Sequence, residues 1–545
     1  MMRGMMMAQP LLITGLIQYA ARYHADTEIV TKTVEGPIHR YTYAAAYARI
    51  QQLAHALDEL GVKPGDRLAT MAWNGHRHFE LYYAISGIGA ICHTVNPRLF
   101  VSQLEYILNH AEDRYVFVDL TFVPLLEQLA PKLKTVKGYI VLTDRAHMPM
   151  STLPNLICYE ELISGKPTTY DWPTFDEWTA SSLCYTSGTT GNPKGVLYSH
   201  RSTILHTYSV NTADSLAFTA RDSVLPVVPL FHVNAWGIPY AATMAGAKLV
   251  LPGPHLDPAS LYDLLENEEV TMTAGVPTIW FKLIEYLDQT GKRLTRLKRV
   301  LAGGSAVPIS LIAAFEEKHN ARVCHAWGMT EISPVGTEGT FKAAQERLPA
   351  EQRYRYQATQ GRPMFGVELK IVDAAGNELP HDGKAFGALL VRGPFVTSGY
   401  FHDPEATKAA FDKEGWFRTG DVVSIDPDGW MRIVDRTKDL IKSGGEWISS
   451  IDLENAAVGH PDVQEAAAIA VPHPKWQERP LLVVVLKPGA KLTRKDMLRY
   501  LGDKVAKWSV PDDVVFVPEL PHTATGKLLK SKLREQFANY QLQSA

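Results

Sequence analysis

Residues 185–195 read Tyr185-Thr186-Ser187-Gly188-Thr189-Thr190-Gly191-Asn192-Pro193-Lys194-Gly195. The three glycines let the backbone approach a ligand closely and point successive N–H groups into one concavity, and four hydroxyls add donors. Lys194 adds a positive point charge, so the combination suits a polyphosphate. The segment is not a Walker P-loop, because it contains no Gly-Lys-Ser or Gly-Lys-Thr order. A flexible loop of no consequence is the alternative, and the ordered string of eleven residues favours phosphate binding.

Around this loop, short β-rich runs alternate with helical patterns. Helical patterns include the apolar spacing from Ile50 to the stop at Gly61, and the segments Pro258–Asn267 and Ile309–His319. The β-rich runs are Leu68–Trp73, Tyr115–Asp119, Tyr139–Thr143, Val224–Val228, Lys248–Leu251, Val270–Thr273, Val300–Ala302 and Val323–Ala326. Such alternation predicts an α/β fold with layered, largely parallel sheets.

The pattern changes after about residue 366, where strand-like pieces become short and turn-bounded. These pieces are Leu369–Val372, Leu389–Val391, Val422–Ile425 and Met431–Val434. The turn Pro427-Asp428-Gly429 suits a hairpin, which predicts a small antiparallel, β-barrel-like subdomain. Beyond Lys438 the pattern is compact α+β, and it ends in a glycine-containing loop and a basic helix. Because 545 residues exceed one core, we predict a large N-terminal domain over 1–437 and a small C-terminal α+β domain over 438–545.

Composition narrows the classes of function. Hydrophobic residues make up 46% of the chain and charged residues 21%, and the net charge is −3. This balance is typical of globular proteins and gives no general attraction to nucleic acid. The four cysteines form no CxxC pair, and no run of about 18 apolar residues or signal-peptide core is found. We therefore expect a cytoplasmic protein without an integral membrane segment, whose contact with a membrane surface is at most transient.

Five distant segments carry further chemistry in a fixed order. They are Gly303-Gly304-Ser305-Ala306-Val307-Pro308, His325-Ala326-Trp327-Gly328-Met329-Thr330-Glu331, Arg418-Thr419-Gly420-Asp421, Asp435-Arg436-Thr437-Lys438-Asp439-Leu440-Ile441-Lys442-Ser443-Gly444-Gly445-Glu446 and Pro521-His522-Thr523-Ala524-Thr525-Gly526-Lys527. Together with residues 185–195 they resemble, in register along almost the whole chain, the motifs of the adenylate-forming superfamily. That superfamily includes acyl-CoA synthetases, firefly-type luciferases and the adenylation domains of peptide synthetases.

The resemblance implies a nucleotide site. Trp327 offers a flat face for adenine, where the family more often has Tyr, and Asp421 can accept hydrogen bonds from both ribose hydroxyls. Glu331 and Thr186 are implied to hold Mg²⁺ with the ATP phosphates, since Mg²⁺ takes carboxylates together with phosphate oxygens. The residues implied to bind ATP or AMP are Thr186, Ser187, Gly188, Thr189, Thr190, Lys194, Gly304, His325, Ala326, Trp327, Gly328, Thr330, Asp421, Arg436, Lys438, Lys442 and Trp447.

The C-terminal domain is implied to be mobile and to supply the catalytic lysine. The Lys527 ammonium would stabilise the charge that builds up when a carboxylate attacks the α-phosphorus. Lys438 matches the hinge about which the small domain turns. We expect Lys530, Lys532 and Arg534 in the following helix to be ordinary solvated charges.

The class of acid substrate is inferred from Val227–Gly237, because this segment lines the acyl site in the family. No aspartate lies between Val227 and Tyr240, which disfavours a substrate bearing an ammonium group. Trp236 aligns with a gate tryptophan of long-chain fatty acyl-CoA synthetases, and simple packing in a wall is its alternative reading. The residues implied to bind the acyl group are His232, Val233, Trp236 and Gly304.

The resemblance is greatest to the medium- and long-chain fatty acid–CoA ligases. It implies an AMP-forming acid–thiol ligase in which carboxylate and ATP give acyl-AMP and pyrophosphate, and the coenzyme A thiol then displaces AMP. The implied requirements are Mg²⁺ with ATP and coenzyme A as co-substrate, and the implied assembly is a homodimer. An adenylating enzyme for a short thioether acid, an aromatic acid or another acceptor stays open, as does chain length. A non-catalytic acyl-adenylate-binding protein is disfavoured because Glu331, Asp421 and Lys527 are all present.

Overall fold

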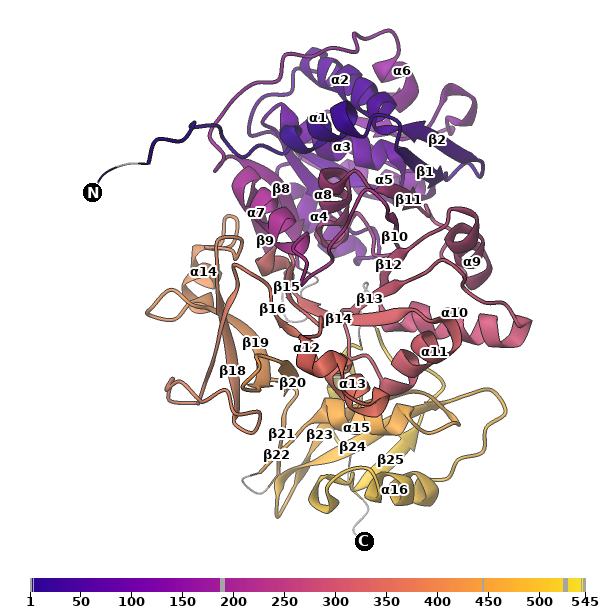
Figure 1. Ribbon diagram of the computed structural model, residues 1–545, viewed down its shortest axis with the longest axis vertical. Coiled ribbons are helices and arrows are strands. Elements are labelled where there is room, and N and C mark those ends of the chain that lie inside the picture. The colour runs from indigo at the N-terminus through magenta and orange to yellow at the C-terminus, as the bar shows by residue number, and fades with distance from the viewer. Residues whose placement is uncertain are drawn as a thin grey trace.

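A computed structural model describes residues 2, 4–186, 192–443, 446–522, 528–540 and 542. Figure 1 shows two large sheets with their helices in the upper and middle parts, a smaller antiparallel sheet beside them, and the yellow C-terminal unit packed below. This layered α/β architecture, followed by a smaller α+β unit, confirms the fold class predicted from the sequence.

The first large sheet has nine strands. Its order is β16 (Arg362–Pro363), β15 (Val335–Glu338), β14 (Arg322–Gly328), β13 (Arg299–Gly303), β12 (Met272–Gly275), β10 (Ser223–Pro226), β11 (Lys248–Leu251), β1 (Glu28–Lys32) and β2 (Ile38–Thr42). Pairing is parallel from β14 to β1 and antiparallel at both edges. The N-terminal hairpin of β1 and β2 thus completes a sheet whose other strands come some 200 residues later.

The second large sheet has seven strands. Its order is β7 (Leu156–Cys158), β6 (Gly138–Val141), β5 (Tyr115–Val118), β3 (Arg67–Met71), β4 (Ile91–Thr94), β8 (Ala180–Tyr185) and β9 (Gly195–Ser199). All neighbours are parallel except β8 and β9, which are antiparallel. The segment between Tyr185 and Gly195 is therefore the connection of a hairpin at the edge of this sheet.

Helices cover both faces of each sheet. Between the two sheets lie α1 (Thr14–Tyr23), α2 (Tyr43–Glu59), α3 (His76–Gly87) and α8 (Ile238–Ala245), whose apolar side chains share one core with both sheets. The far face of the nine-stranded sheet packs on α9 (Pro258–Asn267), α10 (Pro277–Thr290) and α11 (Ile309–His319), and that of the seven-stranded sheet on α4 (Val101–His110) and α5 (Val123–Leu129). Adjacent residues such as Ile29 and Val30 enter different cores, because successive side chains of a strand point to opposite faces. The remaining helices of the N-terminal part are α6 (Tyr159–Ile163), α7 (His200–Val210), α12 (Ala343–Glu346), α13 (Ala350–Gln357) and α14 (Pro404–Ala410).

The smaller antiparallel sheet follows as predicted. Its order is β17 (Glu368–Val372), β18 (Phe386–Arg392), β19 (Phe417–Ile425) and β20 (Met431–Arg436). The predicted turn joins β19 to β20, with Gly429 at φ +90°. Trp327, from the nine-stranded sheet, lies in the same apolar cluster as this sheet, so the packing of the two brings their functional motifs together.

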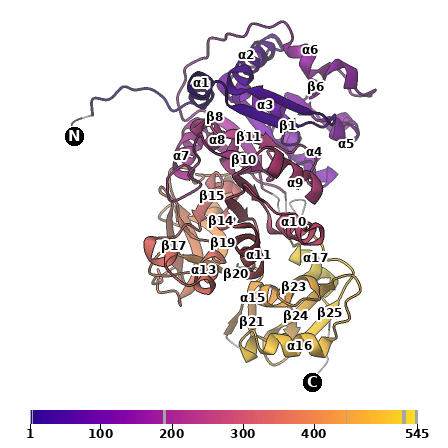
Figure 2. The same ribbon diagram turned by 45° about the vertical axis from the view of Figure 1, so that its right-hand side comes forward.

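The C-terminal unit is built on a five-stranded sheet of β22 (Glu446–Ile448), β21 (Ile441–Ser443), β24 (Gln477–Leu486) and β23 (Val463–His473), with β25 (Asp513–Phe516) beside β24. One face packs on α15 (Ser450–Val458) and α16 (Arg494–Gly502), and the other on α17 (Lys530–Gln536). In Figure 2 this unit lies below α10 and α11. Across the described part of the chain, no helix is both long and apolar enough to span a bilayer.

Candidate active site

The two ends of the phosphate loop, which we define as residues 186–194, are joined by hydrogen bonds. The Thr186 backbone N–H donates to the Lys194 carbonyl at 2.9 Å, and the Lys194 N–H donates to the Thr186 hydroxyl at 3.1 Å. The candidates Ser187, Gly188, Thr189 and Thr190 lie outside the described residues. Their flanks are held in hairpin geometry, which fixes where the loop starts and ends.

Lys194 and Glu331 converge on Tyr400. The Lys194 Nζ lies 4.8 Å from the centre of the Tyr400 ring, and the Tyr400 hydroxyl donates to Glu331 Oε1 at 2.7 Å. Nothing in the sequence around Tyr400 singles it out, and sequence reasoning missed it. Only the pairing of the Tyr400–Phe401 segment with Gly195 brings it to the loop.

Glu331 suits a cation. It lies in a short 3₁₀ turn directly after β14, and the residue is only 5% exposed. Burial raises the pKa of its carboxyl, and the Tyr400 hydroxyl, Lys194 and Arg436 oppose that rise. A buried carboxylate beside the phosphate loop fits one ligand of Mg²⁺, which would take its other oxygens from phosphate and water.

Trp327 and Asp421 are in direct contact although 94 residues separate them. The indole N–H of Trp327 donates to Asp421 Oδ2 at 2.9 Å, and Arg436 Nε lies 3.4 Å from Asp421 Oδ1. Trp327 is 7% exposed and Asp421 4% exposed. The predicted adenine and ribose residues therefore meet, and Trp327 anchors the carboxylate of Asp421.

The remaining nucleotide candidates line the ends of β13 and β14. Ala326 pairs with Gly303, and Gly304 follows with φ +84°. His325 is buried, its Nδ1 is bonded to the Ala358 carbonyl, and burial lowers its pKa to about 4. His325 is therefore neutral near pH 7 and holds the chain in place rather than adding charge. Close backbone packing requires glycine at Gly328, where a Cβ would lie 2.1 Å from the Pro334 carbonyl oxygen. The backbone carbonyl of Thr330 accepts a hydrogen bond from the Tyr198 hydroxyl.

Two of the acyl candidates, Val233 and Trp236, lie in a turn that the sequence did not predict, and His232 directly precedes it. Residues Val233–Gly237 form a left-handed turn, η4, in which every residue has positive φ. Val233 is buried, whereas His232 and Trp236 are half-buried. The Trp236 ring borders Gly303, since a Cβ there would lie 3.2 Å from the ring tip. The acyl candidates and the candidate Gly304 thus occupy one neighbourhood.

The hinge-segment candidates belong to the C-terminal side. Lys438 lies between β20 and β21, and burial lowers its pKa. Lys442 and Trp447 face each other across β21 and β22, with the Lys442 Nζ 5.0 Å from the ring centre. The candidate Lys527, and Gly444 with Gly445, lie outside the described residues.

Of the three basic residues expected to be solvated, Lys530 and Arg534 instead form ion pairs within the protein. The Lys530 side chain is 10% exposed, forms a 2.7 Å ion pair with Glu454 and donates to the Ser450 hydroxyl at 2.5 Å. Arg534 forms an ion pair with Asp439. The prediction of ordinary surface charges was wrong for these two, because α17 packs against the sheet and turns Lys530 toward α15 and Arg534 toward the hinge segment, whereas Lys532 is exposed as expected.

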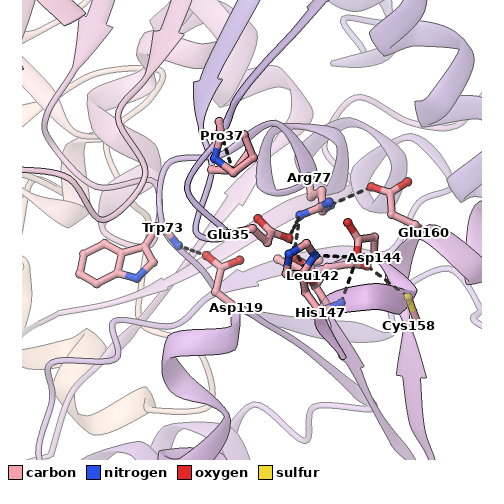
Figure 3. Close-up of polar contacts among 12 residues, drawn as sticks. Glu35, Pro37, Trp73, Arg77, Asp119, Leu142, Asp144, His147, Cys158 and Glu160 are labelled. Carbon is pink, nitrogen blue, oxygen red and sulfur yellow. Dashed lines mark hydrogen bonds and ion pairs between the residues drawn. The ribbon is translucent and has the colours of Figure 1, made fainter. Parts of the chain in front are cut away.

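A separate polar cavity of about 20 Å³ lies at the carboxyl ends of β3 and β5. Figure 3 shows Asp119 accepting from the Trp73 backbone N–H, and Arg77 bonded to Glu35 and Glu160. Burial raises the pKa of Asp119 to about 7, and the charge of Glu35 adds to the rise. A cavity of this size has room for about one water molecule, so it is too small for a nucleotide or acyl chain.

Comparison with known proteins bears on the whole chain. Residues 17–401 match the family described as AMP-binding enzyme, and residues 452–527 match that described as AMP-binding enzyme C-terminal domain. The chain is 52% identical to a 3-methylmercaptopropionyl-CoA ligase of Ruegeria lacuscaerulensis, over 98% of this chain and 99% of that protein. It is 49% identical to a medium-chain-fatty-acid–CoA ligase of Ectopseudomonas oleovorans, over 100% and 99%. An anthranilate CoA ligase solved with anthranoyl-AMP has a TM-score of 0.86 at 25% identity, over 98% and 99%.

Proposed function

The chain belongs to the AMP-binding enzyme family and is an acid–thiol ligase that forms acyl-CoA, and we propose that its acid is an uncharged aliphatic carboxylate, a medium- to long-chain fatty acid. The observation that carries this proposal is the chemistry of the wall around Trp236. Val228, Ala235 and Ile238 are buried in the apolar cluster against which Trp236 packs, and no acidic residue lies between Val227 and Tyr240. An apolar wall favours a chain that has only CH₂ groups to bury.

The apolar wall sets a quantitative expectation. Each buried CH₂ contributes about 0.8 kcal/mol, or about fourfold in affinity. A pocket that encloses the chain should therefore raise kcat/KM by up to about fourfold per added CH₂, until the chain reaches its end. An amino acid substrate would place an unpaired ammonium against this wall, which is unfavourable.

A short thioether acid is the second candidate. The relative that is 52% identical is named 3-methylmercaptopropionyl-CoA ligase. The thioether chain of 3-methylmercaptopropionate is also uncharged and apolar. The two candidates differ in where the pocket ends, and Trp236 is the large side chain that would close a short pocket.

For the first half-reaction, we assign the nucleoside to Trp327, Asp421 and Arg436, and the polyphosphate to the phosphate loop with Lys194. A carboxylate oxygen attacks the α-phosphorus, the bond to the bridging oxygen breaks, and pyrophosphate leaves with its electron pair. Mg²⁺, when bound at Glu331 and Thr186, would neutralise phosphate charge. The Lys527 ammonium would stabilise the charge of the transition state more than that of the ground state.

For the second half-reaction, the coenzyme A thiolate attacks the acyl carbon and AMP leaves through its phosphate oxygen. We assign the domain boundary to 437/438, with Lys438 as the pivot. The position of Lys438 between strands of two different sheets supports this assignment. We also propose that the protein is a homodimer and is located in the cytoplasm. Light scattering of the purified protein tests the oligomeric state.

The experiment is a coupled assay of pyrophosphate release and thioester formation with ATP, Mg²⁺ and coenzyme A. The acids run from about C3 to C18 and include 3-methylmercaptopropionate. A kcat/KM that climbs with chain length to a medium or long optimum supports the fatty acid. A maximum at 3-methylmercaptopropionate with a decline beyond C6 would replace it with the second candidate. A preference for aromatic or amino acids would contradict both.

A further inference from the structure

The turn Val233–Gly237 has a rare backbone. Four consecutive non-glycine residues have φ between 42° and 59°, and Gly237 follows at 76°. For L-residues a left-handed helical turn brings Cβ close to the following carbonyl oxygen, so such residues occur singly rather than in runs. A run of this kind persists only where the surroundings impose it, and such sites are concentrated where function demands them.

The side chain of Asn234 attaches this turn to the rest of the protein. Its side chain is buried, and its amide N–H donates to the Ser182 hydroxyl at 3.0 Å. Its amide oxygen accepts from the Cys184 thiol at 3.5 Å. Burial raises the pKa of Cys184 to about 12, so the thiol keeps the proton that this contact uses. Asparagine is also the polar residue that best tolerates left-handed φ.

Both partners of Asn234 lie on β8, the strand that runs into the phosphate loop. Cys184 is two residues before Thr186, and β8 is paired on both sides, with β4 and β9. The other end of the turn meets different elements. The Trp236 ring borders Gly303, and Gly237 lies against His206, whose ring would be 3.0 Å from a Cβ at that glycine. The turn therefore joins the strand before the phosphate loop to the strand that precedes Gly304.

We propose that Asn234 is the positioning residue that sets the end of the acyl pocket. By tying the left-handed turn to β8, it fixes the place of Trp236 relative to the nucleotide loops and thereby the chain length that the enzyme selects. This inference rests on the proposed function of an aliphatic acid–CoA ligase. Asn234 acts through Trp236 and contacts neither nucleotide nor acid in this scheme.

The variant Asn234→Gly tests the proposal with little backbone strain, since glycine adopts left-handed φ freely. The matched control is Asn320→Gly. Asn320 has φ 52° and ψ 35°, close to the 52° and 41° of Asn234, but it caps α11 on the surface. Both variants make the unfolded chain equally more flexible, so differences between them report the Asn234 side chain.

We expect Asn234→Gly to change acid selectivity rather than overall competence. The ratio of kcat/KM for an eight-carbon acid to that for a four-carbon acid should change about tenfold, because the free energy of one lost buried hydrogen bond corresponds to a factor of about that size. The KM for ATP should stay within twofold, and Asn320→Gly should match the wild type in both measures. Ser182→Ala should shift the ratio in the same direction, and the double variant should shift it by less than the product of the two single effects.

Hydrogen–deuterium exchange of the wild type and both glycine variants gives a second readout that does not need turnover. Asn234→Gly should speed exchange of the amides of residues 233–237 at least tenfold, while Asn320→Gly leaves them unchanged. An unaltered selectivity ratio, or an equal fall for every acid together with a lowered Tm, would overturn the positioning role. If the wild type releases no pyrophosphate with any acid, the proposed function fails, and unchanged exchange in Asn234→Gly would then refute the positioning role separately.

Discussion

Replacing Trp327 with Phe removes one defined contact, the indole N–H that donates to Asp421. The bond is 2.9 Å long and both residues are almost fully buried, so the variant leaves a buried carboxylate oxygen without its indole partner. A hydrogen bond to a charged group contributes about 1.5–3 kcal/mol. Among the described residues, Asp421 would keep only Arg436 as a charged partner, which is half-exposed and 3.4 Å away and therefore contributes little.

The expected result is a loss of about tenfold or more in kcat/KM for ATP, because about 1.4 kcal/mol corresponds to a factor of ten. The KM for the acid should change little, since the contact lies on the nucleotide side. The assay is acid-dependent exchange of pyrophosphate into ATP, measured at saturating acid with varied ATP. Thermal unfolding of the same samples separates lost stability from lost nucleotide binding.

Trp280→Phe is the matched control. Trp280 is fully buried in α10, and its indole N–H donates to the Gly275 carbonyl at 3.2 Å. This variant also loses a buried indole hydrogen bond and ring volume, but away from Asp421. It should lower the Tm and leave kcat/KM for ATP unaltered. If Trp327→Phe keeps kcat/KM for ATP within twofold of the wild type, or if both variants lose it equally, the anchoring role of Trp327 is refuted.

Three further predictions concern other parts of the chain. Lys527→Ala should abolish acyl-adenylate formation yet spare thioester formation from supplied acyl-adenylate, and equal loss of both would contradict its assigned role. Lys438→Pro should slow the thioester step more than adenylation when the two are timed separately; equal slowing would argue against a hinge there. Burial raises the Asp119 pKa from 3.8 to about 7, so the folded protein keeps a proton that the unfolded chain releases, and stability should fall from about pH 4 to pH 7. Asp119→Asn should reduce the dependence of the unfolding free energy on pH and raise that free energy at pH 8 by at most about 4 kcal/mol. Denaturant unfolding at pH 5 and pH 8 measures it, and an unchanged difference between the two pH values would contradict the assigned pKa shift.

The sequence alone determined the elements whose signals are local. The helices at Pro258–Asn267 and Ile309–His319 have the bounds predicted for them, because apolar spacing and end signals lie within the helix itself. In α9, for example, Asp257 caps the first turn by accepting from the Ser260 N–H. The motif order likewise identified the family and the chemistry of ligation before any distance was known.

Tertiary structure alone decided the contacts that join distant segments. Strand β1 pairs with β11 across 220 residues, Tyr400 reaches Glu331, and Lys530 is buried against Glu454. The left-handed turn at Asn234 is also of this kind, since Val233, Ala235 and Trp236 have no local preference for positive φ, and the Asn234 side chain is bonded to β8. Periodicity records which face of an element is apolar, whereas its partner depends on the packing of the whole chain, and that packing sets the geometry of the site.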